Sequence, residues 1–222
     1  MARALAFLLL LLPALARADP VPDAELCRQA IAAAEPGSGI PPGLLGAIAL
    51  VESGRADPRT GRIAPWPWAW NAGGEGHLPA DRATALAEVS SLLARGSNSV
   101  DVGCMQVNLA WHPQAFPSLE TAFDPAANVR YAIAFLRELR ARTGDWAQAV
   151  AQYHSAEVER GLDYQRRVVL ARLGAAFVHG GAVPLPVRLT AGLCAPGMAP
   201  VMRFPPPKAR GVARPHLGCR RR

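Results

Sequence analysis

Apolar side chains are most concentrated in one stretch, residues 40–54, where Glu52 is the only ionisable residue. Apolar residues on every face of a helix indicate that it is buried on all sides. Pro41 and Pro42 stand at the entry, where a helix tolerates a missing N–H. Gly54 follows the last turn, where a left-handed cap is favoured. The pattern predicts a short buried helix that ends next to Glu52.

The carboxyl group of Glu52 is in an unfavourable place for a negative charge. Burial and the negative end of the helix dipole both disfavour the anion, so we expect its pKa to lie above the usual range. A carboxyl that keeps its proton near neutral pH is suited to general acid catalysis. The alternative is that Glu52 reaches the surface where the helix emerges.

The rest of the chain up to about residue 177 shows further helical patterns separated by short breaks. The predicted helices cover residues 23–34, 81–95, 124–142, 145–153 and 163–177. Four of them have aspartate N-caps, namely Asp23, Asp81, Asp124 and Asp145. A hairpin at 66–76 and a short strand at 99–109 are expected between helices. The expected fold class is mainly α (α+β), a helical domain with a small inserted β-hairpin or sheet.

Charge is unevenly distributed along the chain. Residues 19–170 hold 13 Arg and all 17 acids, whereas residues 171–222 hold eight Arg, one Lys and no acid. From about Val178 the apolar spacing gives way to Pro, Gly, Ala and Arg, which predicts a basic tail at 178–222 with little core. The basic pI reflects this tail, so no nucleic-acid partner is expected of the mildly acidic body. The tail's charge favours contact with an anionic wall polymer or membrane surface.

The N-terminus has the pattern of a secretory signal peptide. Arg3 precedes the apolar run 4–12, and Ala16-Arg17-Ala18 is a small-x-small cleavage site. We therefore expect a signal peptide at 1–18, a folded domain at 19–177 and a periplasmic or secreted protein.

Four cysteines in an exported chain favour disulfides, and three complete pairings are possible. A Cys27–Cys104 bond would brace the segment 103–108 against the first helix, and we expect this pair. Cys194 and Cys219 would then close a loop in the tail. Because no Cys-x-x-Cys or His-x-x-x-His spacing occurs, neither a metal nor another cofactor is expected.

The segment 103–108, Gly-Cys-Met-Gln-Val-Asn, is a candidate binding loop. Gln106 and Asn108 are two residues apart, so an extended segment would place both amides on one side. Two amides suit the hydroxyl and N-acetyl groups of a sugar, although an ordinary polar loop would look the same. At 153–154, Tyr153 could bond a carboxyl or a sugar and His154 could act as a base. A half-buried core tyrosine and a polar helix-end histidine are the alternatives.

Aromatic and acidic residues supply further candidates. Trp66, Trp68 and Trp70 have strand spacing and form either a sugar-stacking face or part of the core; Trp111 comes later in the chain. A glycosidase with two carboxylates would need a second acid opposite Glu52. The candidates are Asp57, Glu75 and Asp101, each of which also fits an ordinary turn.

Three motifs together resemble one family: Glu52-Ser53, then 103–108, then Ala-Gln-Tyr-His at 151–154. In this order and spacing they are similar to the soluble lytic transglycosylases related to goose-type lysozyme, over about residues 25–170. The resemblance implies a lysozyme-like fold and cleavage of the β-1,4 bond between N-acetylmuramic acid and N-acetylglucosamine in peptidoglycan.

The resemblance also implies roles for individual residues. Glu52 corresponds to the single catalytic acid/base, and Ser53 to a residue beside the scissile bond. The 103–108 motif, with Met105, Gln106 and Asn108, corresponds to the substrate-binding loop. Tyr153 corresponds to the tyrosine that orients the glutamate or the substrate. His154 departs from the Asn found in many members, which puts the local substrate contacts in question.

Two other functions remain open from the sequence. A hydrolytic lysozyme on the same fold would be favoured if Asp57 or Asp101 held a water opposite Glu52. A catalytically inactive peptidoglycan-binding or assembly protein is the other alternative, against which the retention of Glu52 and both amide motifs argues. Some small exported members of the family open the wall for secretion systems or pili, which makes such an assembly a candidate partner.

Overall fold

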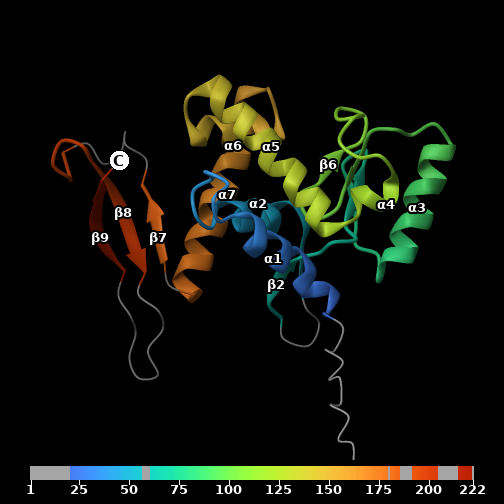
Figure 1. Cartoon of the computed structure of the whole chain (residues 1–222), viewed down its shortest axis with the longest axis horizontal. Helices are drawn as coiled ribbons and strands as arrows, with labels where there is room; N and C mark the ends of the chain where they lie inside the picture. Colours follow the sequence, from blue (N-terminus) through green and yellow to red (C-terminus); the bar gives the residue numbers. More distant parts are fainter. Residues whose placement is uncertain (1–20, 57–60, 180, 186–191, 205–214, 222) are drawn as a thin grey trace, which may run out of the picture.

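The computed structural model describes residues 21–56, 61–179, 181–185, 192–204 and 215–221. Helices dominate, as expected from the apolar spacing (Figure 1). They are α1 (Asp23–Ala34), α2 (Leu44–Ser53), α3 (Arg82–Ala94), α4 (Leu119–Ala122), α5 (Pro125–Thr143), α6 (Trp146–His154) and α7 (Val158–His179). The expected signal peptide lies outside the described residues.

Three small antiparallel sheets accompany the helices in the part of the chain described. A two-stranded sheet pairs β1 (Gly54–Ala56) with β2 (Ile63–Pro65). The second sheet has the order β4-β3-β5-β6. Its strands are β3 (Trp70–Ala72), β4 (Glu75–His77), β5 (Val100–Val102) and β6 (Val107–Asn108). The hairpin is thus confirmed, but the single strand expected at 99–109 is two strands joined by a turn.

Helix α2 lies in the centre of the main hydrophobic core. The side chains of Leu45, Ile48 and Ala49 are fully buried, together with residues of α1, α5 and α7. Helix α7 lies alongside α2 (Figure 1). The prediction that this helix is buried is confirmed, and Glu52 stands at its C-terminal end.

The aspartate caps are correct at three of the four predicted positions. The side chains of Asp81, Asp124 and Asp145 accept backbone N–H groups at the starts of α3, α5 and α6. Asp23 is the first residue of α1 and makes no capping bond. Its carboxylate instead accepts a hydrogen bond from the indole of Trp68, at 2.7 Å.

Gly54 does not form the left-handed cap that its position suggested. Its φ is −59°, and it begins strand β1. A Cβ atom there would lie 2.4 Å from the carbonyl oxygen of Leu50. The residue is small because the chain passes close to the preceding helical turn.

The three tryptophans with strand spacing belong to a second hydrophobic core. Trp66, Trp68 and Trp70 are buried, and each indole N–H donates to a protein oxygen. The core interpretation is therefore correct for these three. Trp111, by contrast, is 79% exposed.

The C-terminal region contains regular structure that its composition did not suggest. Strands β7 (Gly181–Pro184), β8 (Met198–Phe204) and β9 (His216–Arg221) form an antiparallel sheet. The sheet lies beside α7, on the side away from α3 and the four-stranded sheet (Figure 1). The expectation of a basic tail with little core did not include this sheet.

Both disulfides are present in the structure. Cys27–Cys104 has a Cα–Cα distance of 5.6 Å and confirms the expected pair. Cys194–Cys219 ties the segment before β8 to β9. Among the helices that can be described, none is long and apolar enough to cross a membrane.

Candidate active site

The carboxyl group of Glu52 is held by a tyrosine from another helix. The hydroxyl of Tyr164, on α7, donates a hydrogen bond to Glu52 Oε1 at 2.5 Å. Tyr164 is completely buried in the main core. Its partner is 112 positions away in the sequence, so the contact exists only because α2 and α7 pack together.

The surroundings of Glu52 favour its protonated form. Burial of the carboxyl group is the main cause that raises its pKa to about 7, and the nearby charge of Asp101 raises it further. The hydrogen bond from Tyr164 and the charge of Arg167 act in the opposite direction. A carboxyl with this pKa can both donate and accept a proton near neutral pH. The raised pKa agrees with the sequence expectation.

Tyr153 does not hold Glu52. Its hydroxyl donates to the backbone oxygen of Met105 at 2.8 Å, so it fixes the 103–108 segment to α6. The contact with Glu52 that was expected of Tyr153 is made by Tyr164. The sequence contained a sign of this role, because Tyr164 shares the inward face of its helix with Val168, four residues later.

His154 lies against the tyrosine that holds Glu52. The imidazole stacks on the Tyr164 ring, with centroids 4.6 Å apart and planes inclined by 8°. The residue is nevertheless exposed to solvent. Partial burial and the charges of Arg167 and Arg160 lower the pKa of His154.

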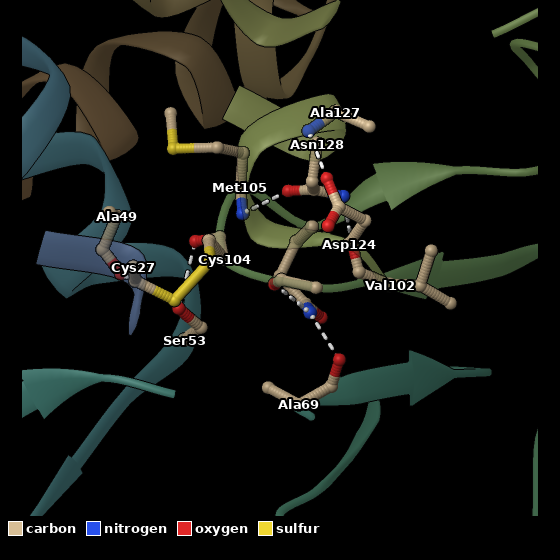
Figure 2. Close-up of a disulfide and its surroundings, with 12 residues drawn as sticks. Cys27, Ala49, Ser53, Ala69, Val102, Cys104, Met105, Asp124, Ala127 and Asn128 are labelled. Carbon is tan, nitrogen blue, oxygen red and sulfur yellow. Dashed lines mark hydrogen bonds between the residues drawn. A yellow bond between two sulfur atoms is a disulfide. The ribbon is translucent and has the colours of Figure 1, made fainter. Parts of the chain in front are cut away.

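The turn between β5 and β6 is held by a buried asparagine that the sequence analysis missed. Asn128, on α5, accepts the N–H of Met105 and donates to the carbonyl of Val102 (Figure 2). It also donates to the carbonyl of Ala122. A Cβ at Gly103 would lie 2.6 Å from this amide, and Gly103 has a φ of +80°. The signal was a polar residue within the apolar face of a predicted helix.

Gln106 and Asn108 do not lie side by side on an extended segment. Gln106 has a φ of +46° and sits in the turn, where its amide donates to the carbonyls of Ala69 and Gly103. Asn108, on β6, donates to the carboxylate of Asp101 at 2.9 Å. Both amides therefore hold protein groups, and the prediction of a shared face is wrong.

Ser53 and Met105 are internal residues. Ser53 is 2% exposed, and its hydroxyl lies 2.8 Å from the carbonyl oxygen of Cys104. Met105 has its side chain fully buried in the main core. Figure 2 shows Ser53 next to the Cys27–Cys104 disulfide. These two residues connect the end of α2 to the turn, and neither side chain is available to a ligand.

A surface hollow of about 370 Å³ lies elsewhere, between the loop 37–39 and the end of α5. It is lined by Arg137, Arg140 and Trp146 among others, and by none of the residues around Glu52. The perturbed carboxyl, rather than the size of a hollow, locates the candidate site.

One comparison with known proteins agrees with this geometry. A family model described as the transglycosylase SLT domain matches residues 29–163, which is more than half of the chain. No curated protein and no solved structure matches this chain. Glu52, the β5–β6 turn and Tyr153 lie inside the matched range, and Tyr164 follows it directly. The chain therefore belongs to the SLT transglycosylase domain family, whose α-dominated, lysozyme-like fold it shares.

Proposed function

We propose that this protein is a peptidoglycan lytic transglycosylase with Glu52 as its single acid/base. It cleaves the β-1,4 bond between N-acetylmuramic acid and N-acetylglucosamine and leaves a 1,6-anhydro end. One observation carries the proposal: a carboxyl group with a pKa of about 7 is held by Tyr164 at the end of a buried helix.

The proton balance of this reaction needs only one group that can both give and take a proton. Protonated Glu52 donates its proton to the leaving glycosidic oxygen as the C1–O bond breaks. The C6 hydroxyl of the same sugar then bonds to C1, and its proton returns to Glu52. Because the nucleophile is already part of the bound sugar, proximity supplies much of the rate. Tyr164 occupies Oε1 and thereby leaves Oε2 to carry the proton.

The residues around Glu52 divide into supports and substrate contacts. Ser53, Met105, Gln106 and Tyr153 fix the β5–β6 turn through the bonds described above. Substrate contacts fall to exposed groups, and His154 is one of them. Trp111 is another, since its backbone N–H is held by Asn108 and its indole is free to stack on a sugar.

The sequence and the disulfides support a proposal for the cellular setting. Two disulfides favour an oxidising compartment. Together with the proposed signal peptide, they support the proposal of a periplasmic or secreted enzyme. A secretion or pilus assembly is a candidate partner on the family resemblance alone.

Product analysis tests the proposal. Purified protein is incubated with peptidoglycan, and soluble muropeptides are measured by mass spectrometry. We expect products lighter by one water than those of a hydrolase, ending in 1,6-anhydro-N-acetylmuramic acid. Glu52→Gln should lower the rate by at least about 10²- to 10⁴-fold.

Other outcomes would identify the alternatives. Reducing ends from the wild type would make it a hydrolytic lysozyme. Binding to peptidoglycan without release of fragments would make it an inactive binding or assembly protein. A fully active Glu52→Gln variant would overturn the assignment of the acid/base.

A further inference from the structure

The three candidates for a second acid opposite Glu52 have different positions. Asp57 lies outside the described residues, and Glu75 is exposed on β4. Asp101, on β5, is half-buried, and its charge acts on Glu52 and on Tyr153. Asp101 is therefore the acid that shares the surroundings of Glu52.

Two connections bring Asp101 and Glu52 together. Ser53, next to Glu52, is hydrogen-bonded to the carbonyl of Cys104, which is three residues after Asp101. Tyr153 is bonded to the carbonyl of the following residue, Met105. The end of α2, the end of β5 and the end of α6 thus meet around the same turn.

The carboxylate of Asp101 is also held in a fixed orientation. Asp101 is directly opposite Asn108 in the β5–β6 register, and Asn108 Nδ2 donates to it. Asn108 Oδ1 accepts the backbone N–H groups of Ala110 and Trp111, both at 3.0 Å. These bonds determine which end of the amide is the donor. Asn108, an expected sugar ligand, is instead a positioning residue for a carboxylate.

We propose that Asp101 is a second catalytic carboxylate, which faces C1 of the bound sugar and stabilises the positive charge that develops there. This inference rests on the function proposed above. The C1–O bond breaks as Glu52 gives up its proton, and C1 carries positive charge until the C6 oxygen bonds to it. Asp101 forms no covalent bond and transfers no proton in this sequence.

The two carboxyl groups have surroundings that suit different roles. Burial dominates at Glu52 and favours the protonated acid. Burial also raises the pKa of Asp101, but the N–H of Asn108 and the charge of His112 favour its anion. Two carboxyls with different environments commonly serve as a proton donor and a charge stabiliser in glycosidases.

The pH dependence of activity distinguishes an electrostatic role of the Asp101 carboxylate from a merely structural one. The described charged and titratable groups that act on the pair are Tyr164 and Arg167 from α7, Tyr153 from α6, and His112 from the loop after β6. Asp101 raises the pKa of Glu52, whereas Tyr164 lowers it. Asp101→Asn should therefore move the alkaline limb of activity to lower pH, and Tyr164→Phe should move it to higher pH.

The experiment measures the release of 1,6-anhydro muropeptides between pH 4 and 10 by wild type and variants. We expect Asp101→Asn to lower kcat by about 10²- to 10³-fold, as for loss of one electrostatic stabiliser. Asn108→Ala leaves the Asp101 carboxylate in place but removes the bond that orients it, so it should cause a smaller loss of kcat. Glu75→Gln removes an exposed acid from the same sheet and should retain the wild-type rate and pH limb.

Wild-type kcat and an unmoved alkaline limb in Asp101→Asn would overturn the inference. If Asp101→Asn fails to fold, as judged by thermal unfolding, a wild-type kcat in Asn108→Ala would have the same consequence. Failure of the proposed function would be seen separately, as a wild type that releases no anhydro products or as a fully active Glu52→Gln.

Discussion

The carboxyl group of Glu52 keeps its proton because the protein makes ionisation costly. The apolar helix α2 and the core around it remove water from the group, and one tyrosine hydroxyl replaces only part of that solvation. The same burial that makes Glu52 a useful acid must therefore lower the stability of the folded protein once the group ionises.

Glu52→Gln should make this cost measurable as a function of pH. The folded pKa of about 7 lies above the ordinary value of 4.5, so the folded protein holds the proton where the unfolded chain has lost it. The contribution of Glu52 to stability is complete below the unfolded pKa and is lost as pH rises through 7. Gln keeps the shape and does not ionise, so the variant should gain stability relative to wild type, by at most about 3 kcal/mol above pH 7.

Urea unfolding of both proteins at several pH values between 4 and 8.5 checks this expectation. The difference should grow from pH 4.5 to 7 and then level off. Glu75→Gln, which alters an exposed acid, is the control and should show no such trend. A difference independent of pH would contradict the buried-acid interpretation.

Individual residues of the site were predictable where the signal was local. Glu52 stands out because no other ionisable residue occurs in its apolar helix. Tyr164 and Asn128 were not predicted, because their partners are 112 and 23 positions away. For the same reason the contact with Glu52 was considered for Tyr153, which belongs to a recognisable motif.

At the scale of elements, the β5–β6 turn is the most firmly fixed part of the site. The Cys27–Cys104 disulfide ties it to α1, Asn128 ties it to α5 and Tyr153 ties it to α6. Because Cys104 is also bonded to Ser53 at the end of α2, movement of the turn would displace the surroundings of Glu52. Stability and activity should therefore depend on the same covalent bond.

Replacing both Cys27 and Cys104 by Ser tests this dependence without leaving an unpaired thiol. We expect a loss of about 2–4 kcal/mol in the free energy of unfolding, because the bond closes a long loop. Cleavage should also slow as the turn becomes mobile. Urea unfolding and muropeptide release measure the two effects.

The matched control is Cys194→Ser with Cys219→Ser, which opens the other disulfide, at the C-terminal sheet. This variant should keep the wild-type rate on soluble glycan fragments. Equal effects of the two double variants on cleavage would show that the first disulfide has no special connection to the site.

Elements were predictable to different extents from the sequence. The helices α1, α2, α3, α5 and α6 have apolar spacing or cap residues that act within one or two turns, so their positions were largely correct. The one-turn helix α4 was not predicted. The conformation of Gly54 was not, because a close approach between α2 and β1 determines it. The sheet β7–β8–β9 was missed because its strands are separated by long Pro- and Gly-rich segments and joined by pairing over distance.

At the scale of the whole molecule, the chain combines an acidic body with a basic C-terminal sheet. We propose that the catalytic domain covers 19–177 and that residues 178–222 form an accessory region. The sheet is not isolated from the body, since it packs on α7. Arg172 of α7 in turn donates to the carbonyl of Pro42 before α2. Removing the whole region would therefore mix loss of charge with loss of packing, and point substitutions give a cleaner test.

Arg220→Gln combined with Arg221→Gln removes two exposed positive charges from β9 and leaves the Cys194–Cys219 bond in place. Attraction between the acid-free C-terminal region and an anionic polymer is screened by salt. We therefore expect the double variant to bind insoluble peptidoglycan more weakly than wild type at low salt, and to lose less binding as salt rises. Cleavage of short soluble fragments should not change, because they engage only the surroundings of Glu52.

The effect is measured by sedimentation of the protein with peptidoglycan at a series of NaCl concentrations. Arg142→Gln on α5 is the control for loss of an exposed arginine. A salt dependence equal to that of the wild type would show that the charge of β9 does not contribute to wall binding.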